Sequence, residues 1–234
     1  VPPEGTVFHN ADNDYIRGRL GQVEAPAVTY GASPDSAADY RAGDITVDSS
    51  GSSFTVTAPG GEARRFTTKL LGAHNIQNIT GCIAVAHSLG IPLAELVAPV
   101  RRLKPVEHRL QLLPNGYFDD AYNSNPAGFR AALDVLRGFE GQRVLVTPGM
   151  VELGERQAAL NQELGAYAAS RCDYAVLVGE KQAPPLKKGL LENGFPEERL
   201  FVARDLAEGL AWVNALPAEG KRTVLLENDL PDNF

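Results

Sequence analysis

The hydrophobic and polar positions divide the chain into two stretches with different periodicities. Up to about residue 70, short apolar runs are separated by turn sequences such as SSGSS and APGG, which are typical of β-hairpins. The predicted strands are Thr6–His9, Ala27–Tyr30, Asp44–Val47, Phe54–Ala58 and Ala63–Lys69. Two helices should follow, from about Asn75 to Leu89 before Gly90, and from Leu93 to Leu103 before Pro105. We therefore expect a sheet edge with a β-meander and two helices, with a domain boundary at Pro105.

Strands and helices alternate after this boundary. A hairpin should join Arg109–Leu113 to Tyr117–Ala121, because Asn115-Gly116 supplies the positive φ angles of a tight turn. Further strands are predicted at Val144–Thr147, Tyr174–Val178, Leu200–Ala203 and Thr223–Leu226. The helices between these strands are predicted from caps and from apolar positions. The caps are Asn125 before Pro126 and the Asp205–Glu208 capping box. The apolar positions are a first stripe of Phe129, Ala132, Leu133 and Leu136, a second stripe of Leu160, Leu164, Tyr167, Ala168 and Cys172, and the segment Leu186–Leu191. This alternation predicts an α/β fold with a doubly wound, Rossmann-like domain from 106 to 234.

Composition narrows the class of protein. With 234 residues and 44% hydrophobic content, the chain can bury one large core or two smaller ones. A net charge of -7 and the lack of a basic run disfavour nucleic-acid binding. No apolar stretch approaches the roughly 18 to 20 residues that span a bilayer, and no signal pattern opens the chain, so we expect a cytoplasmic protein without membrane insertion. Cys82 and Cys172 lie in or beside apolar helical stretches, which favours buried thiols over a disulfide or a metal pair.

Four segments carry candidate chemistry, and none of them is a phosphate loop. Gly220-Lys221 is the one Gly-Lys pair, and it lacks the surrounding GxxxxGK[ST] pattern, so we interpret it as a surface turn. In LLGAHNIQN (70–78), Asn75 suits an adenine edge, although His74 or Asn75 could instead cap the helix. In PVEHRLQ (105–111), Arg109 could be a forked donor for a phosphate or a salt-bridged strand residue.

The other two segments follow predicted strands, where ligands of open α/β sheets bind. FDDAYNSNPAG (118–128) ends its strand with two carboxylates, and a carboxylate suits a ribose diol because it accepts from two hydroxyls at once. The alternative is a polar turn with an Asn cap. VTPGMVELGE (146–155) is either a loop shaped for a small ligand or a plain connection.

Taken in this order, GAHNIQN, EHRLQ, DDAYNSNP and TPGMVELG resemble the motifs of the Mur ligase family of ATP-dependent peptide ligases. The resemblance covers essentially the whole chain and is strongest to the branch that adds D-alanyl-D-alanine. It implies that residues 1–105 are the rear part of a central ATPase domain and that 106–234 are the whole C-terminal domain. The phosphate loop, the magnesium ligands and a carbamylated lysine are then expected upstream.

The resemblance also implies the site residues and the reaction. Asn75 contacts the adenine with His74 beside it, Arg109 reaches the nucleotide, and Asp120 holds the ribose. The residues expected near the incoming dipeptide are Tyr122, Asn123, Asn125, Met150, Glu152 and Leu153. ATP with Mg2+ activates the carboxylate of UDP-MurNAc-tripeptide as an acyl phosphate, which the amine of D-alanyl-D-alanine attacks in peptidoglycan precursor synthesis. No catalytic residue is assigned, and the chain alone is expected to be inactive.

One segment departs from the family pattern. Many relatives carry a basic Lys-Gly-Ser-Arg-like stretch near the C-terminus, whereas this chain has LLENDLPDNF (225–234). Two alternatives stay open: another amide ligase of the superfamily, of the folylpolyglutamate or cyanophycin synthetase kind, or a non-catalytic nucleotide-binding or assembly module. The DDAYNSNP segment favours the muramyl branch over the first alternative, and a GxxxxGK[ST] segment upstream would exclude the second.

Overall fold

The computed structural model describes residues 1–228 except positions 49, 123, 181, 218 and 219. Asn123 and the segment 229–234, both part of the sequence-based predictions, therefore lie outside the described residues. The chain forms two compact units, Val1–Lys104 and Pro105–Phe234. Among the described residues no helix is both long and apolar enough to span a membrane.

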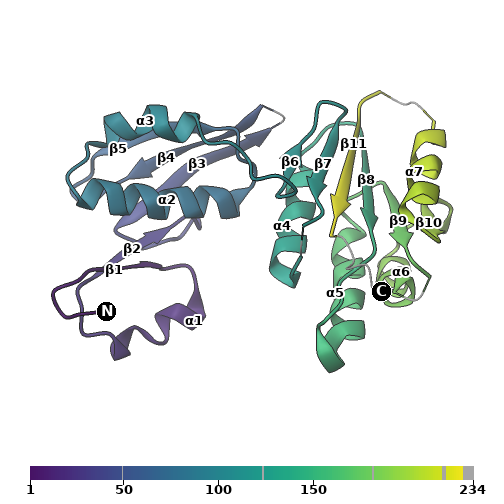
Figure 1. Cartoon of the computed structure of the whole chain (residues 1–234), viewed down its shortest axis with the longest axis horizontal. Coiled ribbons are helices and arrows are strands. Elements are labelled where there is room, and N and C mark those ends of the chain that lie inside the picture. The colour runs from purple at the N-terminus through teal and green to yellow at the C-terminus, as the bar shows by residue number, and fades with distance from the viewer. Residues whose placement is uncertain (49, 123, 181, 218–219, 229–234) are drawn as a thin grey trace. The chain divides into compact units, whose positions relative to one another are not determined.

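The first unit is a five-stranded sheet with helices packed on it (Figure 1). Its elements are β1 (Val7–Asn10), α1 (Asp14–Arg17), a 3-10 turn (Leu20–Gln22), β2 (Ala27–Gly31), β3 (Tyr40–Asp48), β4 (Gly51–Thr57), β5 (Ala63–Thr68), α2 (Ala73–Ser88) and α3 (Leu93–Arg101). The strands lie in chain order, with β1, β2 and β3 parallel and β3, β4 and β5 antiparallel. The predicted meander is β3–β5, and β1 and β2 extend it into a mixed sheet.

The core of this unit forms where the sheet meets α2 and α3. Phe54 and Phe66 are register partners, fully buried, with ring centroids 5.8 Å apart. Burying a side chain of this size contributes about 1.5 to 3 kcal/mol. Ile76 and Ile83 of α2 and Leu93 of α3 belong to the same buried cluster. Cys82 lies on the side of α2 away from this stripe and is exposed, so the prediction of a buried thiol is wrong for this residue.

The second unit alternates strands and helices, as the sequence predicted. Its elements are β6 (Gln111–Leu112), β7 (Tyr117–Asp120), α4 (Pro126–Arg137), β8 (Gln142–Thr147), a 3-10 turn (Gly154–Arg156), α5 (Gln157–Ala168), β9 (Tyr174–Val178), α6 (Ala183–Glu192), a 3-10 turn (Glu197–Arg199), β10 (Leu200–Ala203), α7 (Leu206–Ala215) and β11 (Arg222–Glu227). The strand order is β10-β9-β8-β11-β7-β6, with β6 antiparallel to β7 and the other pairs parallel. The predicted α/β fold with a doubly wound sheet is confirmed.

Helices cover both faces of this sheet (Figure 1). Val213 and Trp212 of α7 pack with Val144, Val176 and Val224 on one face. The alternate residues of the strands point to the other face of the sheet. Helices α4, α5 and α6 cover that face, with α4 packed on α5 and α5 packed on α6. A right-handed crossover places its helix on one face when the chain moves one way across the sheet and on the opposite face when the chain moves back. The chain moves back across the sheet between β10 and β11, so α7 lies on the opposite face from α4, α5 and α6.

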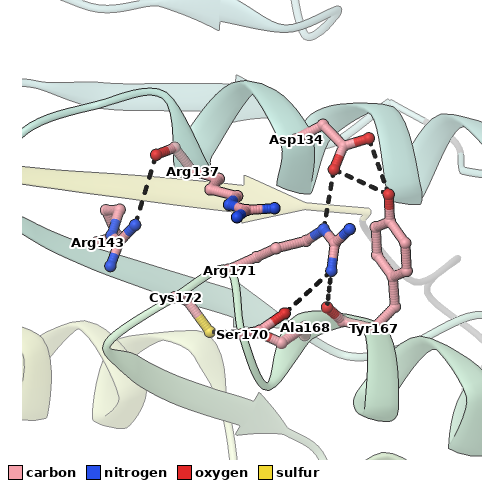
Figure 2. A network of polar contacts seen from close by, with 8 residues as sticks. All are labelled: Asp134, Arg137, Arg143, Tyr167, Ala168, Ser170, Arg171 and Cys172. Atoms are coloured by element: carbon pink, nitrogen blue, oxygen red, sulfur yellow. Dashed lines mark hydrogen bonds and ion pairs between the residues drawn. The ribbon is translucent and has the colours of Figure 1, made fainter.

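A polar network joins α4 to the C-terminal end of α5 (Figure 2). Asp134 of α4 accepts from the hydroxyl of Tyr167 at 2.8 Å and from Nε of Arg171 at 2.8 Å. The Arg171 guanidinium also lies over the Tyr167 ring, 3.3 Å from its centre. Next to it, Cys172 is buried as predicted, and burial raises the pKa of its thiol to about 12. This thiol therefore stays protonated at neutral pH.

Asp173→Asn is expected to destabilise the second unit by about 1 to 2 kcal/mol at pH 7, because Asp173 accepts from Nη2 and Nε of Arg143 at 2.8 Å and 3.0 Å. The Arg143 hydrogen bonds hold the pKa of Asp173 below its ordinary value of 3.8. A lowered folded-state pKa means that the stabilisation is present above that ordinary value and is lost as the pH falls below it. Urea unfolding followed by the fluorescence of Trp212, the one tryptophan, measures this at pH 7 and at pH 3.

The control is Glu163→Gln, which removes the exposed pair between Glu163 and Arg130 (Oε2 to Nη2, 3.4 Å). Exposed pairs of this kind contribute little, so a change below about 0.5 kcal/mol is expected. If Asp173→Asn loses the same free energy of unfolding at both pH values, the ion-pair explanation is wrong.

Candidate functional site

Three neighbouring parallel strands of the second unit end side by side, with polar residues at their ends. β7 ends at Asp120 and β11 at Glu227, and these two residues are register partners. β8 lies on the other side of β11 and ends at Thr147. Since ligands of open α/β sheets bind beyond the carboxyl ends of strands, the loops that leave these strands form the candidate site.

The segment before β6 is fastened to the residues that end and follow β7. The backbone nitrogen of Leu110 donates to Oδ1 of Asp120 at 2.9 Å, and Nδ1 of His108 lies 2.8 Å from Oδ2 of Asp119. The backbone nitrogen of Tyr122 donates to the carbonyl of His108 at 3.3 Å. The motifs EHRLQ and DDAYNSNP, which are separate in the sequence, are therefore joined in one surface.

Arg109 lies in the bend before β6, so its predicted position on a strand is wrong. The reason is local: φ is 59° at His108 and 47° at Leu110, and such angles interrupt an extended strand on both sides of Arg109. The exposed guanidinium places its Cζ 4.6 Å from the centre of the Tyr122 ring. Within the residues that the structure describes, Arg109 makes no ion pair, which contradicts the alternative of a salt-bridged strand arginine.

The loop after β7 is fixed where it enters α4. Oδ1 of Asn125 accepts from the backbone nitrogens of Ala127 at 3.1 Å and Gly128 at 2.9 Å, so the predicted cap is confirmed. The hydroxyl of Ser124 donates to Oε1 of Glu227 at 2.5 Å. The cap uses only the amide oxygen of Asn125. The amide nitrogen of Asn125 belongs to a side chain that is exposed to solvent.

A buried asparagine holds the loop after β8. Asn161 of α5 is 1% exposed; its Oδ1 accepts from the Met150 nitrogen at 2.9 Å and its Nδ2 donates to the Met150 carbonyl at 2.8 Å. Directly after β11, Nδ2 of Asn228 donates to the carbonyl of Gly149 at 2.7 Å. The loop is therefore held to α5 on one side and to the residue after β11 on the other.

The predicted site residues of this unit differ in what they expose. Arg109, Tyr122, Asn125 and Glu152 expose their side chains, with Tyr122 at 64%. Leu153 is half-buried and Met150 is buried, so Met150 can shape the loop but does not present its side chain to solvent. Asn123 lies outside the described residues.

Gly149→Ala is expected to destabilise the second unit and to displace the loop after β8. At Gly149 φ is 79°, and an added Cβ would lie 2.8 Å from Cδ1 of Leu186 and 2.9 Å from Oδ1 of Asn161. Gly179→Ala is the matched control, because Gly179 has φ of 86° but nothing within 4 Å of the added Cβ. Both variants carry the backbone strain, and the clash should cost Gly149→Ala about 1 to 2 kcal/mol more in urea unfolding. Equal losses of unfolding free energy in the two variants would show that the loop after β8 can move to accommodate the added methyl group without cost.

Glu227 is a site residue that the sequence-based reasoning missed. It is fully buried, and burial first and the negative charge of Asp120 second raise its pKa well above the usual value for glutamate. Its Oε2 is buried and has no hydrogen-bond partner among the described atoms. The available signal was a carboxylate directly after a buried strand, but the strand was predicted to end at Leu226. The register of β11 against β7, which places Glu227 beside Asp120, has no signature in the sequence.

The first unit holds the two other predicted residues. α2 begins at Ala73 with Gly72 as its N-cap, at φ of 91°, so neither His74 nor Asn75 is the cap and that alternative is wrong. Asn75 is half-buried, and its Nδ2 donates to the carbonyl of Leu71 at 2.8 Å. This bond uses one of the two amide hydrogens. His74 is exposed at the start of the helix.

Comparisons with known proteins follow the division into two units. Residues 108–226 match the family model described as Mur ligase, glutamate ligase domain, and residues 1–86 match the Mur ligase middle domain. The UDP-N-acetylmuramoyl-tripeptide--D-alanyl-D-alanine ligase of Escherichia coli is 32% identical over 235 residues, which cover 97% of this chain and 51% of that protein.

Solved structures agree with these matches. The crystal structure of MurF from Acinetobacter baumannii has a TM-score of 0.83 and 25% identity, and the match covers 97% of this chain and 49% of that one. The MurF ligase from Thermotoga maritima, in complex with ADP, has a TM-score of 0.79 and 18% identity, with coverage of 97% and 51%. The chain therefore spans about half the length of the proteins that it matches.

Proposed function

Because the chain belongs to the Mur ligase family, we propose that it is part of an ATP-dependent amide ligase that joins D-alanyl-D-alanine to UDP-MurNAc-tripeptide in peptidoglycan precursor synthesis. The observation that carries this proposal is the 32% identity with the Escherichia coli ligase over 97% of the chain. In this proposal residues 1–105 are the rear part of the central domain, residues 106–234 are the C-terminal domain, and the reaction takes place in the cytoplasm.

We assign the nucleotide to residues whose chemistry suits its parts. Asp120 ends a strand with a carboxylate, which can accept from the two ribose hydroxyls, and Arg109 carries an exposed guanidinium that suits a phosphate. Asn75 keeps donor and acceptor capacity for an adenine edge, with His74 beside it. The ADP bound to the Thermotoga maritima protein supports a nucleotide of this kind.

The dipeptide is assigned to the loops after β7 and β8. Tyr122, Asn125, Glu152 and Leu153 present polar and apolar groups there, Met150 shapes the second loop, and Asn123 is assigned to the same set by resemblance. ATP transfers its terminal phosphoryl group to the tripeptide carboxylate and leaves as ADP. The dipeptide amine then attacks the carbonyl carbon of the acyl phosphate, loses a proton and expels inorganic phosphate. This chain's own contribution is to hold adenosine and amine in place, which lowers the entropic barrier.

By resemblance to the family, magnesium accompanies ATP in this proposal. No group of three His, Cys, Asp or Glu side chains in the described residues is placed to hold a metal ion. On the same resemblance, we place the magnesium ligands, the phosphate loop and the carbamylated lysine in the rest of the complete protein, and no step is assigned to magnesium in this chain.

The test uses the complete gene product. Phosphate release from ATP is measured with UDP-MurNAc-tripeptide, or in separate reactions with a folylglutamate or a cyanophycin primer as the carboxylate substrate, and with a panel of amines: D-alanyl-D-alanine, L-lysine, diaminopimelate, glutamate, aspartate and arginine. We expect turnover with the dipeptide and at most background with the others. Turnover that depends on glutamate, or on aspartate and arginine, would instead indicate a ligase of the folylpolyglutamate or cyanophycin synthetase kind. Nucleotide binding without turnover for any amine would indicate a binding module.

The 234-residue chain alone is expected to show no magnesium-dependent ATP hydrolysis, because charge on the transferred phosphoryl group must be stabilised by groups assigned to the rest of the protein. The complete protein at the same concentration is the positive control. ATP hydrolysis by the purified chain above that of a buffer blank would contradict the assignment of the phosphoryl-stabilising groups to the rest of the protein.

A further inference from the structure

We propose that Glu227 is a positioning residue of the nucleotide site: as an uncharged carboxylic acid it donates a hydrogen bond to Asp120 and fixes the carboxylate that we assign to the ribose. The role of Asp120 rests on the proposed function. The pairing of the two carboxyl groups stands on the geometry of the second unit alone. Glu227 is the first residue of the ENDLPDNF stretch (227–234).

Strand register places the two carboxyl groups together. Asp120 and Glu227 are Cα partners on the parallel neighbours β7 and β11, so their side chains leave the sheet on the same side. Neighbouring strands lie about 4.8 Å apart. The backbone nitrogen of Asn228 donates to the carbonyl of Asp120 at 3.1 Å, which continues the pairing past the end of the strand.

One of the two carboxyl oxygens of Glu227 accepts a hydrogen bond, and the other is available to carry a proton. Oε1 accepts from the hydroxyl of Ser124 at 2.5 Å, while Oε2 is buried without a hydrogen-bond partner among the described atoms. A buried polar atom in this state costs about 1 to 3 kcal/mol. A proton on Oε2 that is donated to Asp120 removes this cost, and Oδ1 of Asp120 is at the same time held by the nitrogen of Leu110.

The charges nearby keep the proton on Glu227. Burial first and the negative charge of Asp120 second raise the pKa of Glu227, and the hydrogen bond from Ser124 opposes them. The charged group that acts on it is Asp120 on β7, whereas Ser124 and the end of β8 at Thr147 are uncharged. Two carboxylates side by side in a buried place do not both ionise. Glu227 is fully buried and Asp120 half-buried, so the proton stays on Glu227.

An ionised Glu227 that binds the cationic amine of a substrate is the competing explanation. It requires a side chain that a ligand can reach, and Glu227 is 0% exposed. The two explanations differ in the response to glutamine, which keeps the shape and a hydrogen-bond donor but has no charge.

The first experiment follows the carboxyl carbon of Glu227 by NMR through a pH titration of the 234-residue chain. Glu227→Gln identifies the resonance by its disappearance. We expect Glu227 to titrate well above the usual range for glutamate, and Asp120→Asn to bring its midpoint down because the neighbouring charge is removed. A midpoint in the ordinary range, or one that Asp120→Asn leaves unmoved, overturns the inference.

The second experiment measures ADP binding to the complete protein by calorimetry. Glu227→Ala is expected to weaken binding about five- to tenfold, and Glu227→Gln should bind more tightly than Glu227→Ala because its amide still donates to Asp120. Wild-type affinity should also fall as the pH rises through the pKa of Glu227, since the second carboxylate then repels Asp120, and Glu227→Gln should not show this fall. Glu140→Ala, an exposed glutamate in the turn before β8, is the control.

The outcomes separate the two proposals. If Glu227→Gln binds ADP as weakly as Glu227→Ala, the positioning role is wrong. If the wild-type complete protein binds no ADP, the proposed function fails, while the titration still decides whether Glu227 holds the proton beside Asp120.

Discussion

Asp120→Ala in the complete protein is expected to weaken nucleotide binding about ten- to a hundredfold, because charge-assisted hydrogen bonds worth roughly 1.5 to 3 kcal/mol are lost. Asp120 ends β7 at the carboxyl edge of the sheet, and the backbone nitrogen of Leu110 holds its Oδ1. Titration calorimetry of the complete protein with ADP gives the affinity, and the Trp212 fluorescence melt of the 234-residue chain with the same substitution gives the stability. We expect a large loss of affinity together with a lower melting temperature, because the nitrogen of Leu110 loses its acceptor.

Two further variants test the assignment. Asp35→Ala removes an exposed aspartate of the first unit and should leave both quantities unchanged. Arg109→Lys should weaken binding several-fold, because an ammonium cannot reproduce the planar fork that lies over Tyr122. A lowered melting temperature with normal ADP affinity for Asp120→Ala would mean that the residue is structural and that the ribose assignment is wrong.

Asn161→Leu is expected to lower the free energy of unfolding of the second unit by about 3 to 5 kcal/mol, the largest loss predicted for any single stability variant of this chain. The leucine keeps the approximate volume but leaves the nitrogen and the carbonyl of Met150 without the partners that they have at 2.9 Å and 2.8 Å. Each buried group left in this state costs about 1 to 3 kcal/mol. Urea unfolding monitored at Trp212 measures the loss.

The matched control is Asn193→Leu. Asn193 also donates a side-chain hydrogen bond, to the carbonyl of Gly189 at 2.9 Å, but it is exposed at the end of α6. Water can replace that partner, so we expect a loss below about 1 kcal/mol. Similar losses for the two variants would show that the loop after β8 finds new partners without Asn161.

Most elements of both units could be predicted from periodicity, because the apolar positions repeat with the spacing of strands or helices. The pairing of strands could not. β11 lies between β7 and β8, and nothing in the segment Arg222–Glu227 says which neighbours it takes. Single backbone angles also escaped prediction: positive φ at His108 and Leu110 turned the expected strand at Arg109 into a bend.

The candidate site also has some features that could be predicted from the sequence and others that could not. Motif order pointed to the Mur ligase family, and the family models confirm it. The local cap at Asn125 could also be predicted, since it depends on residues next to each other in the chain. Asn161 and Glu227 could not, because their importance comes from burial against distant segments. The assignments of Asn75, Arg109 and Asp120 to nucleotide stay predictions until the variants above are measured.

The central place of β11 has a consequence for biosynthesis. It is the last strand of the described chain, yet it lies inside the sheet and separates β7 from β8. While the nascent chain is still short of this strand, β7 and β8 each offer an unpaired edge to other molecules. Closing the sheet then needs contacts between residues far apart in sequence, which is slow. We expect this unit to depend on chaperones until its last strand has emerged from the ribosome, and a chain stopped before Arg222 to aggregate.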